Sequence, residues 1–142
     1  MIIFVSMDTV RDPLRKKDVA LTPEESVRQW FIGLLHESCG VPMHQMMSEV
    51  QLVCPGGKTY RADIVVYGHG GVPAAIVECK RPEVQLTAEV LEQALRYGAM
   101  LGVKCLMLTS GRSTLVALRE GDAWKRSDHI PTYDELNITD AI

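Results

Sequence analysis

The sequence has little that would attract nucleic acid through overall charge or place the chain in a membrane. Its 142 residues have a formal net charge of −3 at pH 7, so no global positive field draws it to a polyanion, although a local basic groove is still allowed. No apolar run approaches the roughly 18 residues of a membrane-spanning helix. Met1–Val5 is apolar, but neither a basic region nor a long apolar one follows it. We therefore expect no secretory signal, no membrane contact and a cytoplasmic location.

Cysteine and histidine are few, and neither is spaced as a framework. No two of the four cysteines form a Cys-x-x-Cys pair, and the four histidines form no spaced pair. We therefore expect reduced, buried thiols rather than disulfides or a zinc site. The sequence also lacks repeats, low-complexity segments and linkers, so we expect a single domain over residues 1–142.

The two ends of the chain show no clear periodicity. Residues 1–21 are expected to be an irregular basic leader, and residues 120–142 a polar tail. The run from Arg11 to Lys17 is either a solvated arm or an arm that contacts phosphate groups.

Apolar spacing between these ends predicts two helices and a sheet. Thr22-Pro23-Glu24-Glu25 has the pattern of a capping box with proline at the first helical position, and a helix over 23–38 follows. Its expected core stripe comprises Val27, Trp30, Phe31, Leu34 and Leu35. A second helix is expected over 87–101, and strands over 50–54, 61–67, 73–80, 103–109 and 113–119.

This order of elements predicts an α/β fold with a mixed central sheet flanked by helices. Short turns join the first three strands, which is typical of an antiparallel meander. The continuous apolar run over 103–109 suits a strand that is buried on both faces.

Charged residues end the strand over 73–80. Glu78 and Lys80 share one face of that strand, and Pro82 prevents its continuation. Asp63 lies on the neighbouring strand, where it can meet Glu78 across the hairpin. Two close carboxylates repel each other unless a cation lies between them, and hard oxygen ligands suit Mg²⁺ or Mn²⁺. With Lys80 acting on a water molecule, this set meets the requirements of metal-assisted phosphodiester hydrolysis.

These residues resemble the signature of a known superfamily. Asp63 followed by Glu78-Cys79-Lys80 is similar to the D…E-x-K motif of the PD-(D/E)XK nucleases, whose restriction-endonuclease-like α-β-β-β-α-β core has the predicted order. Gln93-Ala94-Leu95-Arg96-Tyr97 is similar to a Q-x-x-x-Y motif of RecB-like nucleases. A closer resemblance, from about Asp8 to about Leu118, is to the N-terminal nuclease domain of type I restriction enzyme R subunits. It rests on LTPEESVRQW, RADIVVYGHGGVPAAIVECKRPEVQLT and QALRYGAMLGVKCLMLTSG.

The resemblance implies a role for each residue of the motif. Asp63 and Glu78 would bind the divalent metal, the backbone carbonyl of Cys79 would complete its protein ligands, and Lys80 would act on the attacking water.

Further residues are implied around this centre. Gln93 and Tyr97 would position the site or contact the DNA backbone. Glu25 matches an accessory carboxylate of many superfamily members, although the capping box already accounts for it. Arg61 and Arg81 flank the site and are either solvated or in contact with phosphate.

The first functional hypothesis is a divalent-metal-dependent DNA endonuclease domain. The alternative is a non-cleaving DNA-binding or protein-interaction module that retains the fold, and hydrolysis of RNA would use the same residues. These 142 residues contain no G-x-x-x-x-G-K-[ST] motif, so ATP use and translocation are not expected of them. The expected partners are DNA, separate motor or specificity subunits and, for a homodimer, a second copy of the chain.

Overall fold

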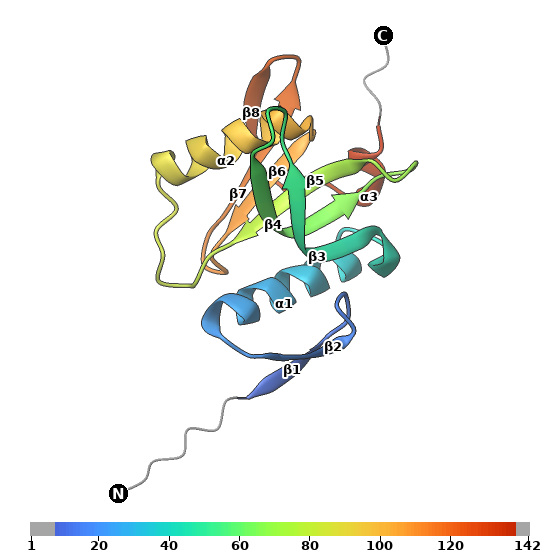
Figure 1. Ribbon diagram of the computed structural model, residues 1–142, viewed down its shortest axis with the longest axis vertical. Helices are drawn as coiled ribbons and strands as arrows, with labels where there is room; N and C mark the ends of the chain where they lie inside the picture. Colours follow the sequence, from blue (N-terminus) through green and yellow to red (C-terminus); the bar gives the residue numbers. More distant parts are fainter. Residues whose placement is uncertain (1–7, 139–142) are drawn as a thin grey trace, which may run out of the picture.

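A six-stranded mixed sheet forms the centre of the computed structural model, which describes residues 8–138 (Figure 1). Its strands lie in sequence order: β3 (Met46–Val53), β4 (Thr59–Tyr67), β5 (Pro73–Cys79), β6 (Cys105–Thr109), β7 (Thr114–Glu120) and β8 (Ala123–Ser127). Neighbouring strands are antiparallel, except that β5 and β6 are parallel. The predicted α/β class, the mixed sheet and the antiparallel meander β3-β4-β5 are confirmed.

Two helices cover opposite faces of this sheet (Figure 1). Helix α1 (Pro23–Glu37) packs on one face, and α2 (Ala88–Leu101), which connects the parallel strands, packs on the other. Along β5, Ala75 and Val77 belong to the core on the α1 side, whereas Ile76 belongs to the core on the α2 side. Strand β5 is therefore apolar on both faces until it reaches Glu78.

The start of α1 differs in part from its prediction. Thr22 Oγ1 accepts a hydrogen bond from the Glu25 N–H at 3.1 Å, as an N-cap should. The Glu25 carboxylate, however, pairs with two arginines, so the reciprocal half of the capping box is not formed. Trp30 was expected in the core, but it is 47% exposed because the face carrying Phe31 turns toward the sheet.

The basic leader is not irregular where the structure describes it. Strands β1 (Thr9–Asp12) and β2 (Lys17–Ala20) form an antiparallel hairpin, and α1 lies between this hairpin and the sheet (Figure 1). The buried carboxylate of Asp12 stabilises the turn, because it accepts from the Leu14 N–H at 2.9 Å and pairs with Arg15. Residues 1–7 of the expected leader lie outside the described residues.

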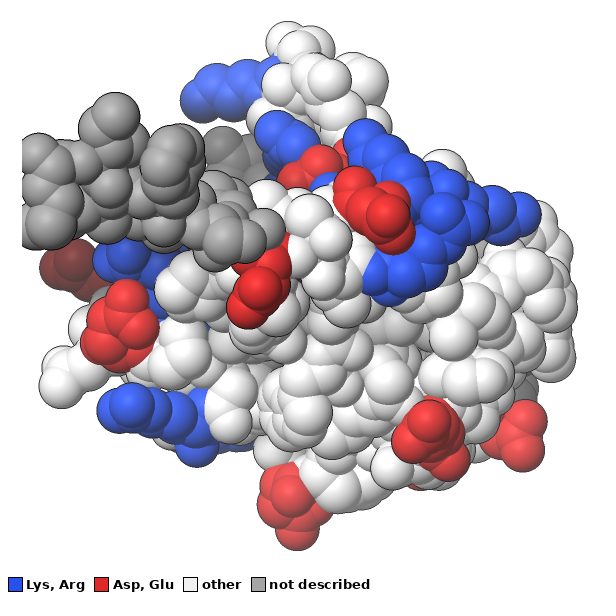
Figure 2. All heavy atoms as spheres, turned by 90° about the horizontal axis from the view of Figure 1, so that it is seen from below, with Lys and Arg blue, Asp and Glu red and all other residues white. Residues whose placement is uncertain are grey.

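Figure 2 shows the underside of the molecule, where Lys and Arg side chains gather on one part of the surface with Asp and Glu among them. Arg15 does not belong to a solvated or phosphate-contacting arm, because ion pairs with Asp12, Glu25 and Glu49 hold it.

The polar tail also folds against the sheet. Beyond β7 it forms β8 and the short helix α3 (Tyr133–Leu136), which begins with a complete capping box between Thr132 and Glu135. The Tyr133 hydroxyl donates to the Tyr67 carbonyl at 2.9 Å, so α3 is attached to the end of β4. Residues 139–142 of the predicted tail lie outside the described residues.

Short features complete the described chain. A 3₁₀ helix, η1 (Met43–Gln45), precedes β3. All four cysteines are buried and free, as the sequence predicted. None of the helices within residues 8–138 is long and apolar enough to cross a membrane.

Asp12→Asn should lower the free energy of unfolding by about 1–3 kcal/mol, because it removes a charge-assisted hydrogen bond from a buried site. Urea unfolding followed by circular dichroism measures the effect. Asp18→Asn is the matched control, since Asp18 is an exposed residue of the same hairpin. Equal stability of the two variants would contradict a structural role for the Asp12 carboxylate.

Candidate active site

The two predicted acidic residues lie on neighbouring strands near the end of β5. In the antiparallel β4–β5 register, Ile64 lies opposite Val77. Asp63 precedes Ile64 and Glu78 follows Val77, so both acidic residues lie one position nearer the end of β5. Asp63 Oδ2 accepts a hydrogen bond from the Cys79 N–H at 2.7 Å. Asp63 is therefore fixed beside the peptide bond that joins Glu78 to Cys79, but it is not among the residues that line the pocket of Glu78.

Glu78 and Lys80 open into a pocket of about 170 Å³ between the sheet and α2. Lys80 Nζ lies 3.4 Å from Glu78 Oε1. Gln93 and Tyr97 of α2 line the same pocket. The structure thus brings both parts of the predicted site together, although they come from a strand and from the helix that follows it.

Tyr60 is a pocket residue that the sequence did not reveal. Its hydroxyl donates to Glu78 Oε2 at 3.1 Å, and its ring stacks on Tyr97 with 4.6 Å between centroids. Burial, and then the negative charge of Glu78, raise the pKa of the Tyr60 hydroxyl well above its usual range, so it remains a donor. Strand β4 begins at Thr59, before the predicted start at Arg61, so the prediction left Tyr60 outside the strand.

Burial destabilises the charged form of Asp63 despite its pairing with Arg28. Burial raises the pKa of this carboxyl from 3.8 to about 6. The Cys79 N–H and Arg28 oppose the shift, whereas Glu24 and Glu78 add to it. The ionised form is therefore destabilised in the folded protein, and a bound cation would reverse that.

The donor set fits a small, hard divalent cation. Within residues 8–138, no three His, Cys, Asp or Glu side chains converge as a metal site. The ligands that the sequence resemblance implies, two carboxylates and the Cys79 carbonyl, would leave the other positions to water. Mg²⁺ usually keeps several waters and binds one or two carboxylates, so this set matches its preferences, and Mn²⁺ favours the same donors.

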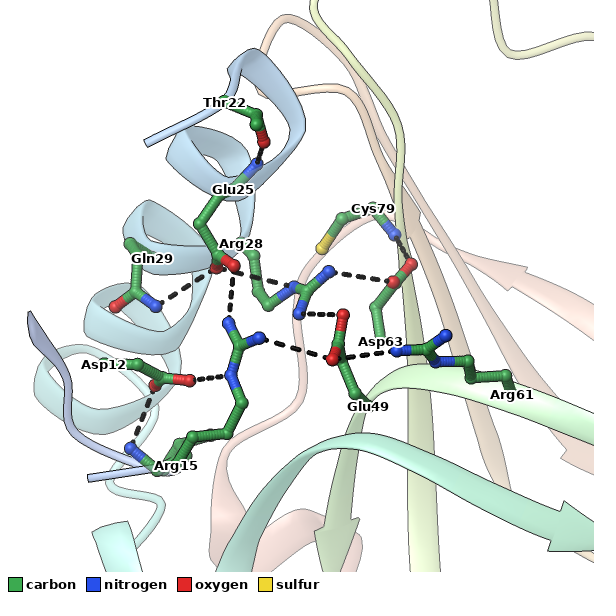
Figure 3. A network of polar contacts seen from close by, with 11 residues as sticks. Asp12, Arg15, Thr22, Glu25, Arg28, Gln29, Glu49, Arg61, Asp63 and Cys79 are labelled. Atoms are coloured by element: carbon green, nitrogen blue, oxygen red, sulfur yellow. Dashed lines mark hydrogen bonds and ion pairs between the residues drawn. The ribbon is translucent and has the colours of Figure 1, made fainter. Parts of the chain in front are cut away.

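A partly buried ion-pair cluster holds Asp63 from the α1 side (Figure 3). Arg28 of α1 reaches Asp63 Oδ1 at 3.4 Å and Glu49 Oε1 at 3.1 Å. Arg15 of the hairpin pairs with Glu25 and with Glu49. Glu25 therefore belongs to this cluster, and its other oxygen accepts from Gln29 at 3.2 Å.

The two flanking arginines also have partners. Arg61 is 2.8 Å from Glu49, and the exposed Arg81 is 3.2 Å from Glu83. Neither is placed inside the Glu78 pocket.

Glu49 is a second residue that the sequence did not reveal. It has a left-handed backbone with φ of 54°, at the point where the β3–β4 pairing is interrupted between Ser48 and Val50. Burial raises the pKa of its carboxyl, but hydrogen bonds and charge from Arg28 and Arg61 outweigh this and lower it. Such a backbone costs about 1–2 kcal/mol in a non-glycine residue. Glu49 preceded the predicted start of its strand, so no pattern marked it.

Comparison with known proteins identifies the family. A sequence model described as type I restriction enzyme R protein N terminus matches residues 23–131. The chain belongs to this family. The resemblance noted from the sequence is thereby confirmed, whereas membership of the PD-(D/E)XK superfamily stays a prediction.

A solved structure has a similar fold to this family member. It is a fragment from Vibrio vulnificus that is assigned to the HsdR subunit of a type I restriction enzyme, with a TM-score of 0.62 and 21% sequence identity. The match covers 82% of this chain and 24% of that one, so this chain spans about a quarter of that protein's length. At this identity the similarity shows the fold alone. The search of curated proteins gave no significant match.

Asp63→Asn should stabilise the protein by about 1–3 kcal/mol at pH 7.5. The pKa of Asp63 is higher in the folded protein, at about 6, than its ordinary value of 3.8. The folded state therefore binds this proton more tightly, and wild-type stability falls as the pH rises from about 4 to about 6. Urea unfolding across this range, without metal, should show that the free energy of unfolding of Asp63→Asn increases relative to that of the wild type as the pH rises.

The control for this experiment is Asp122→Asn, which changes an exposed carboxylate. Its stability should follow the wild-type pH profile. If the Asp63→Asn profile ran parallel to both, Asp63 would not be the destabilised carboxyl.

Proposed function

We propose that this domain is a divalent-metal-dependent DNA endonuclease of the PD-(D/E)XK type. The observation that supports this most directly is that Asp63 binds the Cys79 N–H while Glu78 and Lys80 lie 3.4 Å apart at the end of the same strand. Gln93 and Tyr97 line the pocket into which Glu78 and Lys80 open. Membership of the type I R protein N-terminal family favours a nuclease role for this arrangement.

Each residue has a distinct part in the proposed reaction. Asp63, Glu78 and the Cys79 carbonyl would hold Mg²⁺ or Mn²⁺, which supplies charge neutralisation and a more acidic water. Lys80 Nζ would donate a hydrogen bond to the attacking water or to a phosphate oxygen. Tyr60 keeps one Glu78 oxygen in place through its 3.1 Å hydrogen bond. Gln93 and Tyr97 would orient the scissile strand.

The partners follow from the family relationship. DNA is the proposed substrate, and the domain would act with the other subunits of a restriction-modification enzyme. Translocation and sequence recognition would then come from outside these 142 residues.

One observation favours a second candidate, a non-cleaving module with the same fold. Both Asp63 oxygens are already engaged, one by the Cys79 N–H and the other by the cationic Arg28. If Arg28 permanently replaced the metal, the site would be a structural remnant.

Calorimetric titration with Mn²⁺ should distinguish the two candidates. The nuclease should bind the ion, and Glu78→Gln should weaken that binding at least about tenfold because a charged ligand is lost. A wild-type protein that shows no heat of binding would favour the non-cleaving module.

Glu78→Gln and Lys80→Ala should each reduce Mg²⁺-dependent cleavage at least about a hundredfold. Plasmid, linear duplex, single-stranded DNA and RNA should be assayed side by side. Circular dichroism should show that both variants remain folded. Lys58→Ala, in the exposed β3–β4 turn, is the control and should cleave at the wild-type rate. If Glu78→Gln cleaved as fast as the wild type, a contaminating nuclease would explain the activity.

A further inference from the structure

A groove lies beside the candidate active site, at the end of β6. One part, of about 680 Å³, lies between residues 82–86 and the β6–β7 turn, and Arg112 and Arg126 line it. A second part, of about 290 Å³, contains Trp30 of α1. Both parts are lined by Pro82, Ser110 and Arg112, so they adjoin at the β6–β7 turn. We refer to the two parts together as the Trp30–Arg126 groove.

The groove begins where the candidate site ends. The Lys80 N–H donates to the Thr109 carbonyl at 2.8 Å. Pro82, two residues beyond Lys80, and Ser110, which follows Thr109, both line the groove.

Its far end is reached by crossing the sheet. Glu78 pairs with Leu108 of β6, Leu108 with Leu115 of β7, and Arg126 lies on β8. Three strand spacings separate β5 from β8, which is about 14 Å.

The charges of the groove favour an anion. Its carboxylate, Glu83, is paired with Arg81 at 3.2 Å. Arg112 and Arg126 are exposed, and within residues 8–138 neither forms an ion pair with a carboxylate. Two guanidinium groups are therefore available for phosphate, although the net charge of the chain is negative.

Trp30 adds a second kind of contact. It is 47% exposed and lines the groove together with Arg112. An exposed aromatic ring beside a cationic groove is the arrangement on which bases of single strands stack. A base inside a duplex already stacks on its neighbours, so this contact requires an unpaired base.

We propose that the Trp30–Arg126 groove binds a DNA strand with unpaired bases, one base stacking on Trp30 and phosphates meeting Arg112 and Arg126. The groove would lead that strand to the Glu78–Lys80 pocket, a direction that rests on the proposed nuclease function. The substrate class is thereby narrowed to DNA with a single-stranded segment, such as a frayed end or an opened duplex.

Fluorescence anisotropy with a labelled 20-nucleotide single strand in EDTA tests this binding without cleavage. Trp30→Ala should weaken binding about tenfold or more, and Trp30→Phe should retain most of it. Arg112→Ala combined with Arg126→Ala should weaken binding and reduce the slope of log affinity against log salt by about 1.4, or about 0.7 per phosphate.

Matched controls come from exposed residues that do not line the groove. Lys125→Ala changes the residue adjacent to Arg126 on β8, and Met47→Ala changes an apolar side chain on β3 that is 53% exposed. Both should bind the strand as the wild type does. Circular dichroism should confirm the fold of every variant.

Two results would overturn the groove: unchanged binding by Trp30→Ala and the double arginine variant, or wild-type affinity for blunt duplex equal to that for the single strand. Glu78→Gln should bind the strand at least as tightly as the wild type. Strand binding without any Mg²⁺-dependent cleavage would refute the nuclease function and leave the groove standing. Mg²⁺-dependent cleavage combined with strand binding that does not depend on Trp30, Arg112 or Arg126 would refute the groove and leave the nuclease function standing.

Discussion

A cluster of opposite charges between the N-terminal hairpin, α1 and the sheet, with Asp12, Glu25 and Arg28 buried and the other members half-buried, constrains the arrangement of this fold. The members are two arginines and four carboxylates: Asp12, Arg15, Glu25, Arg28, Glu49 and Asp63. A buried ion costs several kcal/mol unless it is paired, so shifting the hairpin, the helix or the two strands would leave Asp12, Glu25 or Arg28 buried without a partner. Asp63 is the end of this cluster that reaches the candidate site, and its position is therefore set by contacts well outside the pocket.

Sequence patterns predicted the features that depend on side-chain alternation along a strand and on short turns between strands. The two-residue period of β5 placed Glu78 and Lys80 on one face, and the hairpin brought Asp63 to the same end of the strand. Helical spacing also found α2 and hence the pair Gln93 and Tyr97. These features needed only neighbours in the chain or neighbouring strands, for which sequence patterns carry direct information.

Features that depend on distant partners were missed. The spacing of apolar residues in α1 did not define which of them would face the sheet, so Trp30 was wrongly assigned to the core. The capping-box pattern correctly identified Thr22 as the N-cap, but the Glu25 side chain forms ion pairs with Arg15 and Arg28 instead of the reciprocal hydrogen bond. Glu49 had no signal at all, because its role arises from a break in strand pairing opposite Asp63.

The parallel pairing of β5 with β6 has a consequence for how the domain acquires its chemistry during folding. The hairpins on either side of this pair join residues that are close in sequence, but β5 and β6 can pair only after the crossover through α2 has closed. Contacts between distant segments pay their loop entropy before they gain stability, so they form late. The Lys80–Thr109 hydrogen bond, the α2 wall of the pocket and the entrance of the groove all belong to that late step. A nascent or partly unfolded chain would therefore hold its carboxylates near one another and still lack a complete site.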